Sequence, residues 1–162
     1  VGVNKMALRQ LRYGEDEILR KRCREVPVVD DKIRQLLDDM ADTMYHTETG
    51  AGLAANQVGL LKRLVVIDMG DGLMKLVNPV ITEQSGMQNC IEGCLSFPGK
   101  WGRVNRPKKV TVEALNAYGK KITITGEDDL AKCLCHELDH LDGKVFVDKV
   151  TEWIDLEELK QE

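Results

Sequence analysis

Two of the three histidines in this sequence lie in one pentad, His136-Glu137-Leu138-Asp139-His140. On a helix, residues four positions apart share a face, with Cβ atoms about 5–6 Å apart, so His136 and His140 could bind one metal ion together. Glu137, beside the first histidine, could act as general base on a metal-bound water. The pentad therefore predicts a metal-dependent hydrolase, but it does not say which one.

A catalytic metal site of this kind usually has three protein ligands and one open position, so the pentad needs a partner. His46 is the remaining histidine, but no ligand pattern surrounds it, and we interpret it as a surface or capping residue. Cys94 is the better candidate, because a glycine precedes it and polar and turn-forming residues follow it. Cys133 falls on the histidine side of the same helix, and we expect it to line the wall of the site.

The composition indicates a soluble globular protein of 162 residues with a net charge of -4. This charge argues against a general nucleic-acid binder, and no apolar run approaches the ~20 residues that span a bilayer. Five cysteines, an odd number, without an export signal predict free thiols or metal ligands in a reducing compartment, which we take to be the bacterial cytoplasm. We place a single domain over residues 6–162 and interpret residues 1–5 as a possible vector-derived remnant.

Apolar periodicity predicts the elements that must position these side chains. A first helix is expected from about Asp31 to about Thr47, with Asp30 as its N-cap. A second helix should open at Gly126-Glu127-Asp128-Asp129, run to about Leu141 and stop at Gly143. The remaining expected elements are strands at 64–67, 73–78 and 80–83, an antiparallel hairpin of 109–115 with 121–125, and a short acidic helix over 155–162.

The second helix has two different faces. Its apolar stripe consists of Leu130, Leu134, Leu138 and Leu141, and the histidines fall on the other side. A helix with two such faces should be central, between a core and a site. The order of elements therefore predicts an α+β fold: a single domain with antiparallel β-sheets around a central metal-binding helix.

Three segments together resemble the motifs of the peptide deformylase family. The segment Gly50-Ala51-Gly52-Leu53-Ala54-Ala55-Asn56-Gln57 is similar to the family's first motif, Gly-x-Gly-Leu-Ala-Ala-x-Gln. The segment Glu92-Gly93-Cys94-Leu95-Ser96 matches the second motif, and the pentad matches the third, His-Glu-x-Asp-His. Order and rough spacing also agree, and the resemblance extends from Met6 to at least Asp148.

The resemblance implies a role for each matching position. The ligands of a divalent metal would be Cys94, His136 and His140. Glu137 would take a proton from the metal-bound water and pass one to the leaving amine. Gln57 and the backbone N–H of Leu95 would donate hydrogen bonds to the developing oxyanion. The family's substrate is the N-formylmethionine end of newly made polypeptides, and the products are formate and a free amino terminus.

The resemblance also implies Fe²⁺ as the metal. Affinity order alone would favour zinc or nickel, so purified protein could hold Zn²⁺, Ni²⁺ or Co²⁺ instead. The residues that we expect to form the substrate-binding part of the site are Gly52, Cys133, Glu92 and Arg106. Among these, Cys133 would help to line an apolar slot for methionine, and Glu92 would pair with Arg106 as a brace behind the ligands. Asp139 is expected to be a structural partner rather than a reactant.

Two positions depart from the pattern of some relatives. Cys135 stands where many have glutamine, which adds an oxidisable thiol but removes no ligand. The C-terminal tail is short and acidic, whereas some relatives carry a longer basic helix there that helps to dock on the ribosome. An acidic tail should repel RNA, so a ribosome contact would be transient, and no sequence-specific nucleic-acid partner is expected.

Two alternatives remain at this point. A zinc-dependent peptidase of the His-Glu-x-x-His type would need a third ligand after the pentad, where only Asp142, Asp148 and later acids are available. A non-enzymatic structural metal site would need a fourth ligand such as Cys90 and gives Glu137 no purpose. Neither alternative explains the other two motifs.

Overall fold

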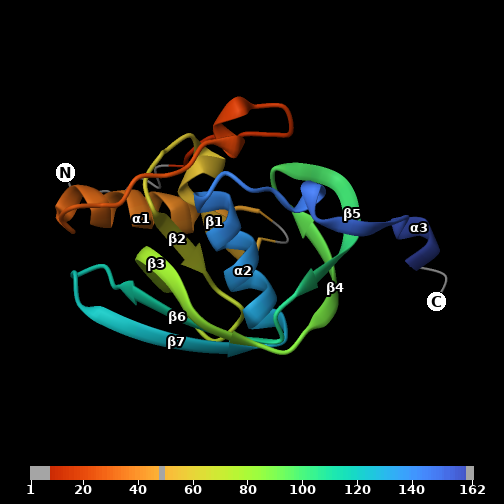
Figure 1. The fold of residues 1–162 in the computed structure, drawn as a ribbon. Coiled ribbons are helices and arrows are strands. Elements are labelled where there is room, and N and C mark those ends of the chain that lie inside the picture. The colour runs from red at the N-terminus through yellow and green to blue at the C-terminus, as the bar shows by residue number, and fades with distance from the viewer. Residues whose placement is uncertain (1–7, 48–49, 160–162) are drawn as a thin grey trace.

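Two antiparallel sheets and a helix between them form the frame of the protein (Figure 1), seen in a computed structural model that describes residues 8–47 and 50–159. The larger sheet has the order β1-β2-β3-β6-β7, built from Gly52–Ala54, Leu64–Ile67, Met74–Ser85, Lys109–Leu115 and Lys121–Glu127. The smaller sheet has the order β4-β5-β8, built from Gln88–Cys94, Phe97–Arg106 and Val150–Ile154. The expected remnant at residues 1–5 lies outside the described residues, so the start of the domain stays a prediction.

The α-helices are α1 (Asp31–Tyr45), α2 (Asp129–Leu141) and the short α3 (Leu156–Leu159). Three 3₁₀ turns accompany them: η1 (Glu17–Arg20), η2 (Ala55–Val58) and η3 (Phe146–Asp148). The predicted N-cap is confirmed, because the Asp30 side chain accepts the Ile33 N–H at 3.0 Å. No described helix has both the length and the apolar character that crossing a membrane requires.

The larger sheet is covered on both faces at β2, which explains why this strand is uniformly apolar. Leu64 and Val66 belong to the core shared with α1, whereas Val65 and Ile67 belong to the core shared with α2. All four side chains are fully buried. Alternate residues of a strand point to opposite faces, so a strand that lies between two helices shows no polar alternation.

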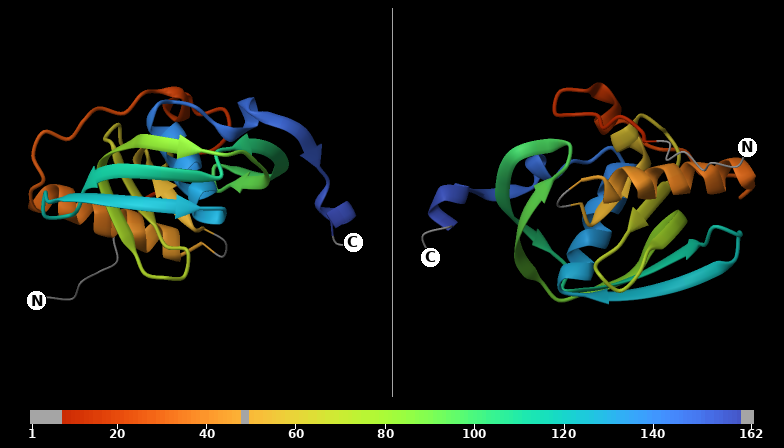
Figure 2. Two further views of the ribbon diagram at one scale, coloured as in Figure 1. Left: turned by 60° about the horizontal axis from the view of Figure 1, so that its bottom comes forward. Right: turned by 180° about the vertical axis from the view of Figure 1, so that it is seen from behind.

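Helix α2 lies between the two sheets (Figures 1 and 2). Its predicted leucine stripe packs into the core of the larger sheet, with Leu134, Leu138 and Leu141 buried and Leu130 against them. The opposite face of the helix, which carries His136 and His140, turns toward the smaller sheet. The predicted α+β class, with antiparallel sheets around this helix, is confirmed.

Three sequence expectations need correction. Strands at 73–78 and 80–83 are one strand, β3, because Asn78 adopts a left-handed conformation with φ 53° and a register shift between Val77 and Val80 absorbs Pro79. Helix α2 begins at Asp129 rather than Gly126, because β7 continues and Gly126 pairs with Val110. The smaller sheet was not predicted at all.

The smaller sheet has a core of its own, formed by Leu19, Phe97, Val104, Val145 and Phe146. Its hairpin of β4 and β5 reverses direction directly after Cys94, which pairs with Phe97. The turn places Cys94 at the end of a strand that faces α2. The two sheets thus bring the second motif and the pentad together.

Candidate active site

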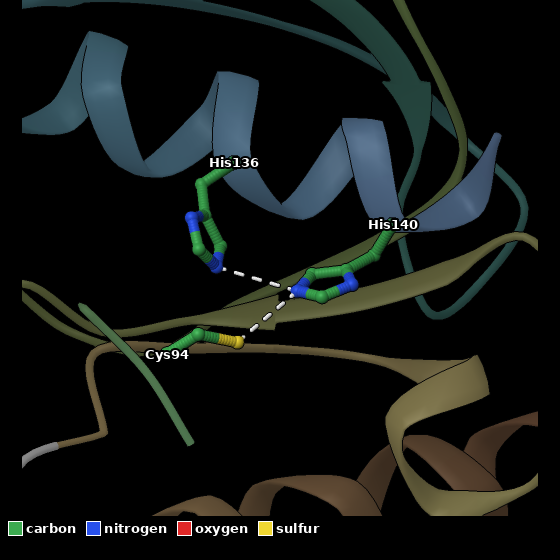
Figure 3. A group of neighbouring side chains, drawn as sticks. All are labelled: Cys94, His136 and His140. Carbon is green, nitrogen blue, oxygen red and sulfur yellow. Dashed lines mark hydrogen bonds between the residues drawn. The ribbon is translucent and has the colours of Figure 1, made fainter. Parts of the chain in front are cut away.

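Cys94, His136 and His140 converge on one point, although Cys94 comes from β4 and the two histidines come from α2 (Figure 3). The Nε2 atoms of the two histidines lie 3.3 Å apart, and Cys94 Sγ lies 3.4 Å from His140 Nε2. For a tetrahedral ion with bonds of about 2.1 Å to nitrogen and 2.3 Å to sulfur, these edges would be about 3.4 and 3.6 Å. These two distances match a tetrahedral metal site, and all three donor atoms lie within 4.8 Å of one another, which leaves one coordination position for water.

Glu92 and Arg106 hold His136 from behind, as the sequence-based interpretation of a brace proposed. His136 Nδ1 lies 2.8 Å from Glu92 Oε1. Arg106 binds both oxygens of the same carboxylate, through Nε at 2.7 Å and Nη2 at 2.9 Å. Because an ionised carboxylate only accepts hydrogen bonds, Nδ1 donates to Glu92, and Nε2 is the ring nitrogen that faces His140 Nε2.

The charges of this brace are buried and mutually compensated. Burial alone would raise the pKa of Glu92, but hydrogen bonds from Arg106 and His136 lower it to about 2. Arg106 also donates from Nη1 to Asp139 Oδ2 at 2.6 Å, and Lys149 lies 2.8 Å from the same oxygen. Asp139 therefore closes a network of ion pairs, consistent with the structural part expected for it.

Glu137 points into the site with an unsatisfied oxygen. Its side chain is buried, and Oε1 has no hydrogen-bond partner among the described residues. Burial raises the pKa of this carboxyl to about 7. Burying a carboxylate oxygen without a hydrogen-bond partner is unfavourable in free energy. A water molecule or a substrate N–H that donates to this oxygen would offset that penalty. The geometry thus gives a proton acceptor beside the metal ligands.

Gln57 is held in one orientation by three contacts. Its Oε1 accepts the Ala54 N–H at 2.9 Å, while Nε2 lies 3.1 Å from Ser96 Oγ and 3.5 Å from Cys94 Sγ. The amide nitrogen therefore faces the metal cluster from the side opposite α2. Such a fixed donor can stabilise negative charge without reorganising at the moment of reaction.

A cavity of about 400 Å³ opens beside the cluster. Its apolar walls include Met69, Ile91, Leu95, Phe97, Trp101 and Cys133. The predicted site residues that reach it are Gly52, Gln57, Glu92, Cys94, Leu95, Cys133, His136 and Glu137. Among the described residues, His140 and Arg106 are the two predicted site residues that do not line it; both are buried behind the surface that the cavity exposes.

Sequence reasoning missed Trp101 and Ser96. Trp101 lies across the hairpin from Gly93, where a Cβ would be 2.7 Å from the indole ring. Gly93 is therefore required for space, since the ring occupies the volume in which a side chain would stand. Finding Trp101 needed the pairing of β4 with β5, which the sequence pattern did not reveal.

Fold and site together define a metal-dependent hydrolase, in which one helix supplies two histidines and a buried glutamate and a separate hairpin supplies a cysteine. The sequence matches a family model described as polypeptide deformylase over residues 8–154. It is 64% identical over 149 residues to peptide deformylase 2 of Clostridium acetobutylicum, covering 92% of this chain and 99% of that protein. It is 59% identical over 156 residues to the peptide deformylase of Acetivibrio thermocellus, and this match covers 96% of this chain and 91% of that protein.

The fold is similar as well. A crystal structure of a peptide deformylase from Legionella pneumophila superimposes with a TM-score of 0.86 at 46% identity, covering 90% of this chain and 87% of that one. The chain belongs to the peptide deformylase family. It is a hydrolase that removes the N-formyl group from the N-terminal formylmethionine of newly made polypeptides. The alternative of a His-Glu-x-x-His peptidase finds no support.

Proposed function

We propose that Cys94, His136 and His140 bind one divalent ion, and that Fe²⁺ is the ion in the living cell. The single observation that carries the ligand set is the convergence of two imidazole nitrogens and one sulfur at tetrahedral spacing. The choice of iron rests on the resemblance to the family. When bound, the ion supplies Lewis-acid polarisation of the formyl oxygen and acidifies a water molecule.

The protein's own groups would then do the rest of the chemistry. Glu137 Oε1 takes the proton of the attacking water and later returns a proton to the leaving amine nitrogen. Gln57 Nε2 and the backbone N–H of Leu95 donate to the oxyanion that develops on the formyl oxygen. The unsatisfied oxygen of Glu137 and the fixed amide of Gln57 support this division of labour.

The cavity supports methionine as the side chain at the reacting end. Its walls are mostly apolar, and Cys133 and Leu95 lie close to the metal ligands. Gly52 leaves space for the Glu137 side chain. Glu92 and Arg106 do not contact the substrate in this proposal; they orient His136, which binds the metal. A formyl carbon carries only hydrogen, so the site can be narrow at that point.

The decisive assay is formate release from a formyl-Met tripeptide by anaerobically prepared, iron-loaded protein. We expect turnover with the formyl peptide and little with the acetyl peptide, whose extra methyl group needs space. His46→Ala, which removes an exposed histidine outside the site, should retain full activity. Absence of formate from folded, iron-loaded protein, or cleavage of an internal peptide bond, would contradict the proposal.

We also propose that the protein acts in the bacterial cytoplasm with a transient contact to the ribosome. Its relatives come from bacteria, and all five cysteines are free thiols, which suits a reducing compartment. The substrates exist as soon as new chains leave the ribosome. Fractionation of the native host followed by detection of the protein would test the location.

A further inference from the structure

Five exposed cations lie at the end of the molecule where α2 terminates. They are Lys21, Arg22, Arg24, Lys62 and Lys144, here called the basic patch. They come from three segments far apart in sequence, the chain after η1, the loop before β2 and the loop after α2. In Figure 1 these segments meet at the top of the molecule, where the orange-red chain crosses the yellow and blue loops.

Backbone contacts join the three segments. Arg24 forms a parallel bridge with Lys62, so their backbones are neighbours. The Cys23 N–H donates to the Leu141 carbonyl at 2.8 Å. A Cβ on Gly143 would lie 2.5 Å from the Arg20 carbonyl oxygen, so the loop before Lys144 lies directly against the chain before Lys21.

The cations face solvent for a simple reason. Cys23 is buried, with 2% of its surface exposed, and successive side chains of an extended segment point in opposite directions. Arg22 and Arg24 therefore both point outward. Lys62, beside Arg24, is exposed as well.

Acids lie near the basic patch, and Asp16 is close enough to interact with the charge of Lys21, but they form no ion pair with the five cations in the described residues. Nearby cations do find partners, since Arg20 pairs with Asp148 at 2.6 Å and Arg63 pairs with Asp142 at 3.0 Å. None of the five residues of the patch has an ion-pair partner within the described ranges. Glu25 is an exposed acid beside it. A local excess of positive charge in a chain of net charge -4 shows a strongly uneven charge distribution.

The patch also lies apart from the catalytic cavity. None of its residues lines that cavity, which opens toward the first half of α2, at Lys132 and Cys133. The patch adjoins the opposite end of the same helix. The acidic C-terminal segment of β8 and α3 projects away on the far side of β5 in all three views (Figures 1 and 2). A large anionic partner on the patch would leave the cavity open and avoid the acidic tail.

We propose that the basic patch binds the phosphate backbone of structured RNA, and that this contact holds the enzyme beside the RNA-rich particle that makes its substrates. The effect on substrate supply rests on the proposed function, whereas the RNA contact does not. Lysine and arginine side chains with no base-reading element give binding by charge, weak at physiological salt and independent of sequence. No exposed large apolar side chain accompanies the patch in the described segments 20–24, 59–63 and 141–145, so it lacks the apolar anchor of a membrane-binding surface.

The test compares two triple variants of the full-length protein. Arg22→Gln/Arg24→Gln/Lys62→Gln removes three charges of the patch, and Lys108→Gln/Lys120→Gln/Lys121→Gln removes three exposed charges elsewhere. Binding to a labelled RNA hairpin is measured by fluorescence anisotropy at several salt concentrations, and binding to purified bacterial ribosomes by co-sedimentation. Turnover of a formyl-Met tripeptide is measured in parallel.

We expect the patch variant to bind the hairpin roughly tenfold or more weakly at low salt, with a salt slope smaller by about 2–3, since each lost phosphate contact removes about 0.9 from the slope. It should also sediment less with ribosomes, while the control variant and the tripeptide activity of both stay near wild type. Equal losses in the two variants, an unchanged patch variant, or binding to anionic lipid vesicles but not to RNA would overturn the proposal. Loss of tripeptide turnover by the wild type would instead count against the proposed function alone.

Discussion

A Cβ atom on Gly52 would lie 2.6 Å from Oε2 and 2.9 Å from Cγ of Glu137. The glycine of β1 is therefore required for space and not for a left-handed backbone, because Gly52 is absent from the residues with positive φ in the described chain. The first motif and the pentad are thus in direct contact, and the backbone of one forms a wall for the base carried by the other.

This contact makes Gly52→Ala a sharp test of how the base is positioned. The added methyl group should displace the Glu137 carboxylate and lower kcat by about 100-fold or more, since a misplacement near 1 Å can cost that much. Metal content and thermal stability should change little. Ala51→Gly, which adds no atom, is the neighbouring control. A Gly52→Ala enzyme with normal kcat would show that the carboxylate does not need this position.

Glu137→Gln should separate proton transfer from metal binding. The amide keeps the shape of the side chain but cannot accept a proton, so kcat/KM should fall by about 10²–10⁴. Iron or zinc content should stay near one per chain. Exposed Glu127→Gln serves as the control. Loss of the metal in Glu137→Gln would mean that this glutamate is itself a ligand.

The Glu92–Arg106 pair should contribute stability that depends on pH. The pKa of Glu92 in the folded protein is about 2, below its ordinary value of 4.5, so the contribution is present above pH 4.5 and is lost as the pH falls toward 2. Glu92→Gln removes one of the two carboxylates that Arg106 binds, and with it the charged partner of His136, so it should cost about 3–5 kcal/mol at pH 7. Urea unfolding at pH 7 and at pH 4 should show the difference from wild type shrinking with acid.

A matched control comes from the surface pair of Arg20 and Asp148, whose side chains are both about half exposed. Asp148→Asn should cost less than about 1 kcal/mol at either pH. Glu92→Gln should also weaken metal binding by about 10–100-fold, because Glu92 orients His136. If Glu92→Gln were no more costly than Asp148→Asn, the brace would have no energetic role.

Removing the sulfur of Cys94 should weaken metal binding more than it lowers the stability of the fold. Cys94→Ser should lower zinc affinity, measured by competition with a chromophoric chelator, by several orders of magnitude, because the site then keeps only two strong ligands. Cys135→Ala, which removes a buried thiol of the core, should retain the metal and lose stability instead. Stripping the metal from the wild type should lower its Tm, since only the folded state presents the full ligand set. Equal metal affinity in Cys94→Ser and wild type would point to another ligand.

Much of the larger sheet was predictable because its residues carry strong periodic signals. The hairpin at 109–115 and 121–125 alternates, and α1 combines an N-cap with helical spacing. Pro79 misled the prediction, since a proline usually interrupts a strand, and here Asn78 supplies the conformation that lets the strand continue. Gly126 also misled the prediction, because a glycine was taken to end the strand. The strand in fact continues, and the glycine is needed for space, since Leu130 Cγ of α2 would lie 2.7 Å from a Cβ at this position.

The smaller sheet escaped prediction for physical reasons. Strands β4 and β5 contain Gly93, Gly99 and Gly102, and Pro98 stands among them, so neither shows an alternating apolar pattern. Gly93 makes room for Trp101, and Gly102 makes room for Val150 of the neighbouring strand. The histidine pair could be predicted from spacing alone, whereas Cys94 as its partner became specific only through the resemblance of three motifs.

Strand β8, Val150–Ile154, follows α2 in the sequence and pairs with β5 of the sheet that carries Cys94. During synthesis, Cys94 is therefore made before His140, which lies 46 positions further along the chain, and before this strand. The cluster of Cys94, His136 and His140 cannot form until all three segments have been made. An enzyme that acts on newly made chains thus cannot acquire its own metal cluster early in its own synthesis.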